Sequence, residues 1–322
     1  MKFFEVQDYI EELRGKNIII GGRGIGKTYS ALSYIVENGE PFIYLRNTDV
    51  QLQECCGDFG NPFKRLNKDF GWNISMSMQK QHANIIQGDK IIGYGCALST
   101  FKNLRSVDLS DVKIVVFEEF IETRKLTFDQ FKAFTHFYET VNRNRDIMGE
   151  DPLKVIFLSN SQSLNNPILI GYDLVGQIEN MIKHKQQKYK RGDIFLLLPE
   201  SEISELKAQT EHYKSLKNTR MYDEIINNKF ANDSFYGIVS HKPMREYKPL
   251  CKIDNIYIWV HKYTLKKYAC YIQAVNIPEF NSKDTGLAFY RNYGKMLYMD
   301  YVAGSLEFSC FQVKASLLDV IK

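Results

Sequence analysis

The chain has 322 residues, of which 44% are hydrophobic, so it can bury a sizeable core and is not a largely disordered protein. Its formal net charge of +4 at pH 7 excludes a polycation that binds nucleic acid through overall charge alone. The six cysteines show no zinc-ligand spacing, and we expect free thiols. Early charges exclude a signal peptide and no apolar run approaches the ~20 residues of a membrane span, so we expect a soluble, intracellular protein without membrane contact.

The chain begins with the pattern of a βαβ unit. After a short amphipathic helix expected at 5–13, an apolar strand is predicted at 16–20, a helix from 27 to near 38, and a second strand at 41–46. Strands joined through a helix pair in parallel, so the pattern predicts an α/β domain built on a parallel sheet.

A glycine-rich segment lies between the first predicted strand and the helix. It reads Gly-Gly-Arg-Gly-Ile-Gly-Lys-Thr and fits the phosphate-loop (P-loop, or Walker A) pattern Gly-x-x-x-x-Gly-Lys-Thr. The glycines allow backbone N–H groups to face phosphates at the positive end of the following helix. We expect Lys27 to reach the β- and γ-phosphates of ATP and the Thr28 hydroxyl to ligate Mg²⁺, while Arg23 contacts phosphate or braces nearby acids. The predicted nucleotide-binding residues are Gly21, Gly22, Arg23, Gly24, Ile25, Gly26, Lys27 and Thr28.

Residues 51–80 are expected to be irregular, because glycines and a proline interrupt them. The dipeptide Gly88-Asp89 is suited to a tight turn and predicts a β-hairpin around it. The other elements predicted in this half are hairpin strands at 83–87 and 90–94, a helix at 128–141, and buried strands at 112–117, 155–158 and 194–198.

Two acids follow the buried strand at 112–117. Glu118 and Glu119 have the Walker-B layout, in which the first acid holds Mg²⁺ through water and the second polarises the attacking water. Glu118 stands where an aspartate is usual, and ligation through water tolerates its longer side chain. Glu119 favours hydrolysis over kinase-type transfer. The alternative for this pair is a solvated acidic loop.

A polar tip follows the buried strand at 155–158. Asn160 is predicted to sense the γ-phosphate, with Ser159 as the second candidate, because a polar residue at the end of a strand beside the P-loop strand lies near that phosphate. A simple turn signal is the alternative.

Two arginines end the helix predicted at 128–141, in the run Asn-Arg-Asn-Arg-Asp. Arg143 and Arg145 are candidates for an arginine finger that completes a neighbouring subunit's site, an effect worth roughly 10³–10⁵ in rate. The sequence does not separate the two, and a solvated helix end that complements the helix dipole is an equal alternative. Lys102 and Arg105 are weaker candidates for the same task or for DNA contact.

The densest positive segment lies at 183–191. It is either a solvated face or a surface that holds the phosphate backbone of double-stranded DNA independently of sequence. Beyond it the pattern changes to a charged, helix-forming stretch and then to strands predicted at 256–260, 268–273, 297–301 and 306–313. We therefore predict a P-loop ATPase domain over residues 1–199, a helical linker over 200–231 and a small β-rich C-terminal domain over 232–322.

The order of these motifs resembles that of the phage genome-packaging ATPases, among which the compact phi-twenty-nine-type encapsidation proteins are similar in length. The motifs are the P-loop, Ser-Thr-Phe-Lys-Asn-Leu-Arg-Ser before Val-Val-Phe-Glu-Glu-Phe, and Phe-Leu-Ser-Asn-Ser. The resemblance is specific over about residues 15–165 and only architectural beyond. It implies a P-loop NTPase domain of the ASCE type (RecA- and FtsK-like), and a C-terminal domain like an RNase-H-type nuclease that has lost its metal-binding acids.

The resemblance also implies how such a protein works. Members of this family form homomeric rings, pentameric in the phi-twenty-nine type, on the portal (connector) of an empty capsid. They push double-stranded DNA inward as ATP is hydrolysed, with an arginine finger acting between subunits. We therefore expect a protein of the host cytoplasm that is transiently at the portal vertex and is not part of the mature virion. Whether a packaging RNA takes part is left open.

The acids of the C-terminal part agree with a degenerate nuclease, because they are scattered and none ends a strand as a pair; they are Asp254, Glu279, Asp284, Asp300 and Glu307. Asp300 is the one to follow, since it comes after an apolar run. Two other functions stay open. One is a large terminase with an active metal-dependent nuclease, and the other is a non-motor nucleotide-binding protein in which ATP sets the oligomeric state.

Overall fold

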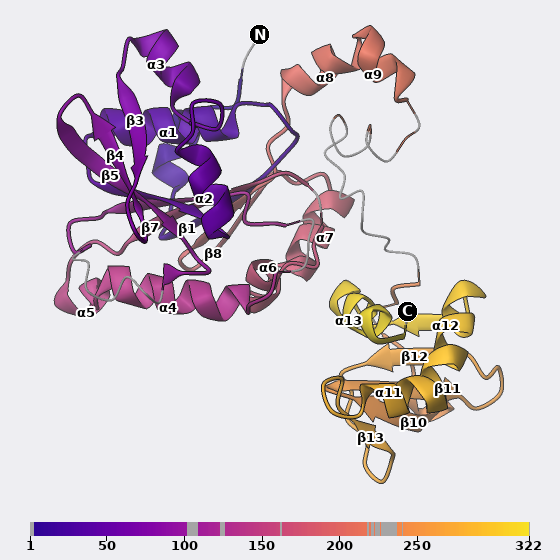
Figure 1. Ribbon diagram of the computed structural model, residues 1–322. Helices are drawn as coiled ribbons and strands as arrows, with labels where there is room; N and C mark the ends of the chain where they lie inside the picture. The colour runs from indigo at the N-terminus through magenta and orange to yellow at the C-terminus, as the bar shows by residue number, and fades with distance from the viewer. Residues whose placement is uncertain are drawn as a thin grey trace. The chain divides into compact units, whose positions relative to one another are not determined.

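The protein divides into two compact units in a computed structural model (Figure 1). The first unit comprises residues 1–172 and 180–232, and the second comprises residues 173–179 and 233–322. The structure describes residues 3–101, 109–122, 126–161, 163–217, 219, 222, 226, 237–239 and 241–321. No helix within these ranges is long and apolar enough to cross a membrane.

A sheet forms the centre of the first unit, and the described residues contribute nine strands to it in the order β3-β4-β5-β2-β6-β7-β1-β9-β8. The strands β5, β2, β6, β7, β1 and β9 are parallel, whereas β3 and β4 at one edge and β8 at the other pair antiparallel with their neighbours. The strands are β1 (Lys16–Ile20), β2 (Phe42–Arg46), β3 (Ile74–Met78), β4 (Ala83–Gln87), β5 (Lys90–Ala97), β6 (Ile114–Glu118), β7 (Lys154–Ser159), β8 (Lys188–Arg191) and β9 (Ile194–Leu197). The predicted α/β architecture with a parallel sheet is confirmed.

Helices precede, connect and follow these strands. They are the 3₁₀ helix η1 (Val6–Glu12) and the α-helices α1 (Lys27–Asn38), α2 (Asp49–Cys55), α3 (Lys64–Phe70), α4 (Gln130–Asn142), α5 (Arg145–Met148), α6 (Pro167–Gly171), α7 (Val175–Lys183), α8 (Glu202–Ala208) and α9 (Glu211–Ser215). Gly26 and Gly39 cap the two ends of helix α1, and both have the left-handed conformation that favours glycine.

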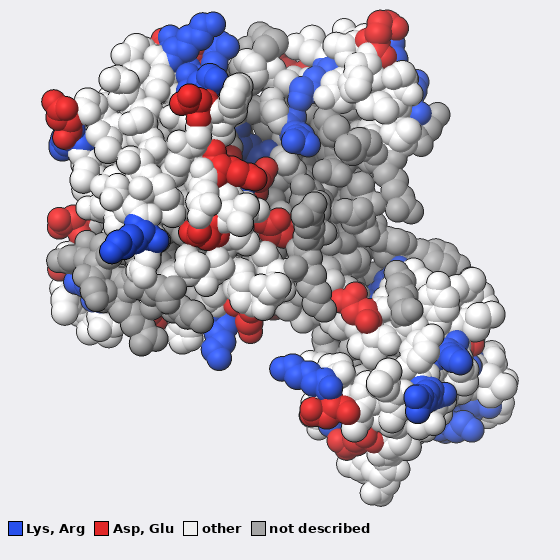
Figure 2. All heavy atoms as spheres, viewed as in Figure 1, with Lys and Arg blue, Asp and Glu red and all other residues white. Residues whose placement is uncertain are grey.

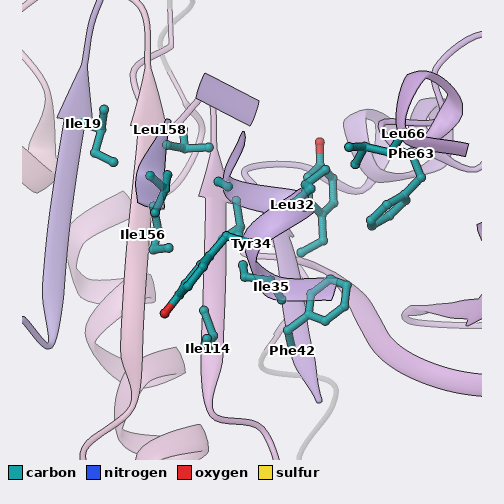
Figure 3. Packing of buried hydrophobic residues seen from close by; sticks show 14 of the residues in the cluster. Ile19, Leu32, Tyr34, Ile35, Phe42, Phe63, Leu66, Ile114, Ile156 and Leu158 are labelled. Atoms are coloured by element: carbon teal, nitrogen blue, oxygen red, sulfur yellow. The ribbon is translucent and has the colours of Figure 1, made fainter. Parts of the chain in front are cut away.

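The central strands are buried on both faces, as expected for a parallel sheet covered by helices. On one face, Ile156 of β7 and Ile114 of β6 belong to the same apolar core as Leu32 of α1 (Figure 3). On the opposite face, Phe157 of β7 packs against Phe134 of α4, with ring centroids 4.9 Å apart. Helices α1 and α4 therefore enclose the strands between two apolar layers.

The parallel strands β6, β7 and β1 end together at one edge of the sheet. Glu118 at the end of β6 pairs in register with Leu158 of β7, and Ile20 at the end of β1 pairs with Ser159. The segments that follow these three strands therefore emerge side by side. In open α/β sheets this edge is where ligands bind.

The prediction of irregular structure over 51–80 is wrong. Helices α2 and α3 and strand β3 occupy most of this segment. Helix α2 starts with a capping box, in which Thr48 accepts from the Gln51 backbone N–H and the Gln51 side chain accepts from the Thr48 N–H. The glycines that suggested irregularity lie between α2 and α3, each only seven residues long.

The second unit contains a sheet to which the described residues contribute five strands, in the order β13-β10-β11-β12-β14. Strands β10, β11 and β12 form an antiparallel meander, while β13 is parallel to β10 and β14 is parallel to β12. The elements are the 3₁₀ helix η3 (Met244–Glu246), β10 (Tyr247–Ile253), β11 (Ile256–His261), β12 (Lys267–Cys270), β13 (Glu279–Phe280), α11 (Gly286–Phe289), the π-helix η4 (Tyr290–Gly294), α12 (Lys295–Val302), β14 (Leu306–Phe308) and α13 (Phe311–Ile321).

The description of this C-terminal part as β-rich is wrong, because it is mixed α/β. The strand predicted at 297–301 lies in helix α12, where Leu297 is buried and Met299 is 66% exposed. The strand predicted at 306–313 ends at Phe308, and helix α13 follows with Val313 and Leu317 buried four residues apart. Short apolar runs fit a strand and a buried helix face equally well, and only packing separates the two.

A buried arginine ties α5 to the loop that precedes β6. Arg145 is 3% exposed, and its guanidinium donates to the carbonyls of Val112, at 2.7 Å, and Ser110. Replacing it with alanine removes this donor from both carbonyls, of which that of Val112 belongs to a buried residue. We expect Arg145→Ala to lower the free energy of unfolding by about 2–3 kcal/mol, measured by urea denaturation. Arg143→Ala, at a neighbouring exposed position, is the control. Equal midpoints for the two variants would contradict this account.

Candidate functional site

The loop between β1 and α1 has the backbone that its glycines require. Gly24 has φ +74° and Gly26 has φ +102°, values that side chains with a Cβ rarely adopt. Gly26 is the N-cap of α1, so the loop leads directly into the helix N-terminus. Ile25 points away from this surface into the apolar core, where it is 1% exposed.

Lys27 reaches back across the loop. Its ammonium donates to the carbonyl oxygens of Gly21, at 2.8 Å, and Gly22, at 2.7 Å, and to Oδ1 of Asn160, at 3.1 Å. Only 7% of the residue is exposed, and this burial lowers the pKa of Lys27 to about 7. The contact with Asn160 joins the loop after β1 to the tip of β7.

Glu118 is held between the loop and a neighbouring strand. Its two carboxylate oxygens accept hydrogen bonds from the hydroxyls of Thr28 and Tyr44, and an Arg46 nitrogen lies 3.4 Å from it. Its side chain is 14% exposed. Burial raises the pKa of Glu118 to about 7, against the lowering effect of the Thr28 hydrogen bond.

Glu119 turns out of the strand into the pocket. Its φ of +50° is a left-handed conformation that is unusual for a glutamate. The Asn47 side chain donates to its carbonyl oxygen at 2.9 Å, and an Arg46 nitrogen lies 2.7 Å from its carboxylate. The side chain is 51% exposed, so the carboxylate is directed by Arg46 and still open to solvent.

These side chains meet in one pocket of about 240 Å³. It is lined by Arg23, Gly24, Gly26, Lys27, Thr28, Glu118, Glu119, Leu158, Ser159 and Asn160. The structure thus brings the predicted P-loop, Walker-B acids and sensor residues together at the edge where β1, β6 and β7 end. Ser159 is buried at 4% exposure, whereas Asn160 is partly exposed and contacts Lys27.

The pocket fits a magnesium nucleotide in its donor chemistry. The hydroxyl of Thr28 and the carboxylate of Glu118 are adjacent oxygen ligands of the kind that Mg²⁺ prefers. Among the described residues, no three His, Cys, Asp or Glu side chains gather as a self-sufficient metal site. In phosphate-transfer sites Mg²⁺ is held by one or two protein oxygens together with substrate phosphates. This pocket can provide the protein oxygens.

Sequence reasoning missed the residues at the end of β2. Tyr44, Arg46 and Asn47 contact the two acids because β2 pairs with β6 in the sheet. The order of strands in a sheet is not visible in the periodicity of the sequence. The one available signal was Arg-Asn-Thr directly after an apolar strand, a polar tip like those that end β6 and β7.

The two candidate arginine fingers lie in different environments, and neither is among the residues that line this chain's own pocket. Arg143 is exposed, at the left-handed C-cap of α4. Arg145 is buried on the carbonyls of Val112 and Ser110. Lys102 and Arg105 lie outside the described residues.

Part of the basic run at 183–191 forms strand β8. Lys188 and Lys190 both pair with Glu12, at 2.6 and 3.0 Å, and Arg191 donates to the Tyr172 carbonyl. These three cations are engaged within the first unit. On the face shown in Figure 2, the described acidic and basic side chains are interspersed.

Lysines and a backbone amide contact four of the five C-terminal acids that the sequence analysis names. Lys242 pairs with Glu307 at 2.6 Å, Lys252 with Glu279 at 2.9 Å and Lys267 with Asp300 at 2.9 Å. Asp254 accepts a hydrogen bond from the Ser282 backbone at 3.0 Å. These pairings place the acids in separate contacts on different elements.

Comparisons with known proteins find relatives of this chain. Residues 1–273 match the family model described as "Podovirus DNA encapsidation protein (Gp16)". The DNA packaging protein of Bacillus phage B103 is 28% identical over 229 residues, which are 68% of this chain but only 65%, less than two thirds, of that protein. The DNA packaging protein of Bacillus phage phi29 is 25% identical over 246 residues, 72% of this chain and 67% of that protein.

Solved structures extend the comparison to the fold. The N-terminal domain of the DNA packaging ATPase from bacteriophage phi29 matches with a TM-score of 0.51 and 25% identity, over 62% of this chain and 97% of that domain. A chain of the bacteriophage phi29 genome packaging motor assembly matches with a TM-score of 0.67 and 18% identity, over 99% of both chains, which shows a shared fold. Because the family model covers well over half of its residues, this chain belongs to the podovirus DNA encapsidation protein family.

Proposed function

We propose that this chain is an ATPase that moves double-stranded DNA into an empty viral capsid. The observation that carries the proposal is the single pocket in which Lys27, Thr28, Glu118 and Glu119 converge. The family and the DNA packaging proteins of related phages supply the context for what the hydrolysis drives.

The polar residues that converge in the pocket have separate roles in hydrolysis. The N–H groups of Gly24 to Lys27 and the ammonium of Lys27 hold the phosphates of ATP. Thr28 and Glu118 would hold Mg²⁺, which when bound would neutralise negative charge on the phosphates. Glu119 orients and deprotonates the attacking water, with Arg46 fixing the direction of its carboxylate at 2.7 Å. Asn160 reports the γ-phosphate through its contact with Lys27.

The assembly that uses this site is a ring of identical chains, a pentamer in our proposal, on the portal of the capsid. An arginine from one subunit, Arg143 or Arg145, completes the site of the next. Arg143 is already exposed, whereas Arg145 would have to leave the two carbonyls that it now contacts. Such a ring acts in the host cytoplasm at the portal vertex and is absent from the mature virion. A packaging RNA is a further candidate partner.

We propose the division into an ATPase domain over residues 1–199, a linker over 200–231 and a C-terminal domain over 232–322 that descends from an RNase-H-type nuclease. The large terminase with an active nuclease is the second candidate. The lysine pairs of Glu279, Asp300 and Glu307 argue against it, because they keep these acids in separate contacts. Metal-dependent nicking of plasmid DNA by the full chain would favour the terminase.

Substitutions of the pocket residues Lys27 and Glu119 should impair different steps, namely ATP binding and turnover. Lys27→Ala should weaken ATP binding by more than about tenfold, because the phosphates lose a buried cation. Glu119→Gln should keep ATP affinity near that of the wild type and lose about 10²–10⁴ in turnover, because only the base is removed. Nucleotide titration and steady-state phosphate release measure the two effects. Normal turnover of Glu119→Gln would refute its assignment as the base.

The rate of ATP turnover should also depend on the presence of double-stranded DNA. A translocase releases phosphate faster when double-stranded DNA is present, whereas a nucleotide-dependent assembly factor does not. We expect DNA of unrelated sequences to stimulate the assembled protein alike, and the stimulation to fall as salt is raised. Slow turnover that DNA leaves unchanged, together with ATP-dependent assembly, would favour the non-motor alternative.

The finger proposal can be tested by mixing variants. Arg143→Ala and Arg145→Ala are each mixed with Lys27→Ala, which lacks a working pocket but keeps both arginines. If the finger acts in trans, one of the two mixtures regains activity that neither component has alone, because a loss of about 10³ or more is restored at mixed interfaces. Absence of recovery in both mixtures, with rings assembled, would contradict a finger at either position.

A further inference from the structure

Helix α8 is the first helix after the sheet and begins the predicted linker. Ser201 caps it by accepting from the Ile203 backbone N–H at 3.1 Å. Ile203 is 5% exposed and belongs to the apolar core that also contains Ile25 of the P-loop. The start of α8 is therefore anchored on the ATPase core and is not a free spacer.

The other end of α8 contacts the P-loop itself. The ammonium of Lys207 donates to the Arg23 carbonyl at 2.5 Å. It also lies 2.8 Å from where a Cβ on Gly24 would stand. Arg23 and Gly24 both line the nucleotide pocket, so Lys207 lies directly against the pocket wall.

The positive charge of Lys207 is disfavoured by its surroundings. Burial and the nearby Arg23 cation lower the pKa of Lys207. A polyphosphate bound beside the loop would favour the charged form of Lys207.

A cavity of about 740 Å³ adjoins the same wall. Gly22 of the P-loop lines it together with residues of α8, namely Glu202, Ser204, Glu205 and Ala208. Lys207 is thus the residue of α8 that brings positive charge to the loop, while the two glutamates of the helix face the cavity.

We propose that Lys207 is a nucleotide-binding residue, supplied to the phosphate loop by the linker helix α8. This assignment of Lys207 rests on the proposed ATPase function. It makes the docking of α8 on the loop depend on bound phosphates. The Lys207 cation adds to phosphate affinity, and the bound phosphates in turn strengthen its hold on the loop. The linker thereby responds to whether the pocket contains nucleotide.

The test compares ATP affinity and the dynamics of α8 in the full chain. Lys207→Met keeps most of the length of the side chain and removes its charge, and we expect it to weaken ATP binding about three- to tenfold. The difference from the wild type should shrink as salt is raised. Lys207→Arg should retain most of the affinity. The matched control is Lys214→Met, on α9, whose lysine pairs with Glu211 at 2.8 Å.

Hydrogen exchange of residues 202–208 gives a second readout that a purely structural contact would not move. ATP should protect these amides in the wild type and in Lys214→Met, but not in Lys207→Met. The inference fails if Lys207→Met binds ATP within twofold of the wild type, or if Lys207→Arg is as impaired as Lys207→Met. If Lys27→Ala loses ATP binding while Lys207→Met does not, only the inference is overturned. A wild-type chain that binds no ATP would overturn the proposed function as well.

Discussion

The site depends on one buried carboxylate. Glu118 accepts from Thr28 at the start of α1 and from Tyr44 on β2, while Arg46 lies 3.4 Å away. Because β2 and β6 are adjacent parallel strands, these contacts fix the P-loop helix against two strands at the edge where both end. Burial raises the pKa of Glu118 to about 7. The surrounding donors must therefore offset the cost of burying its negative charge.

A network of buried side-chain amides connects the residue next to Glu118 with helices α4 and α6. Asn47 donates to the Glu119 carbonyl and accepts from Gln130, the first residue of α4, at 2.6 Å. The Gln130 side chain also accepts from Asn166, the N-cap of α6, at 3.0 Å. Since all three amides are at most 3% exposed, each must find its partners inside the protein. This network supports Glu119 in its left-handed conformation, so the direction in which its side chain leaves the strand is built into the fold.

The residues in consecutive motifs could be predicted from sequence, and the residues brought by the sheet could not. The P-loop lies between a strand and a helix, and the acids at 118–119 follow a strand, and all of these elements can be predicted from the local sequence pattern. Arg46 and Tyr44 contact the two acids only because β2 pairs with β6 in the sheet. The order of strands in a sheet cannot be recognised from the spacing of apolar residues along the sequence. The apolar run of four residues around Leu297 fits a strand and a helix alike, and only packing places it in α12. The basic run that contains Lys188 left a solvated face and a DNA contact as alternatives, and the structure pairs Lys188 with Glu12, which is far away in the chain.

The central claim is that hydrolysis in this pocket moves DNA. The most direct measurement mixes purified empty capsids of the virus that encodes this chain with double-stranded DNA, ATP and the protein, and counts DNA protected from nuclease. The account predicts protected DNA with the wild-type chain and none with Glu119→Gln, although that variant still binds ATP. Packaging by Glu119→Gln at the wild-type level, or failure of assembled wild-type rings to protect any DNA, would contradict it.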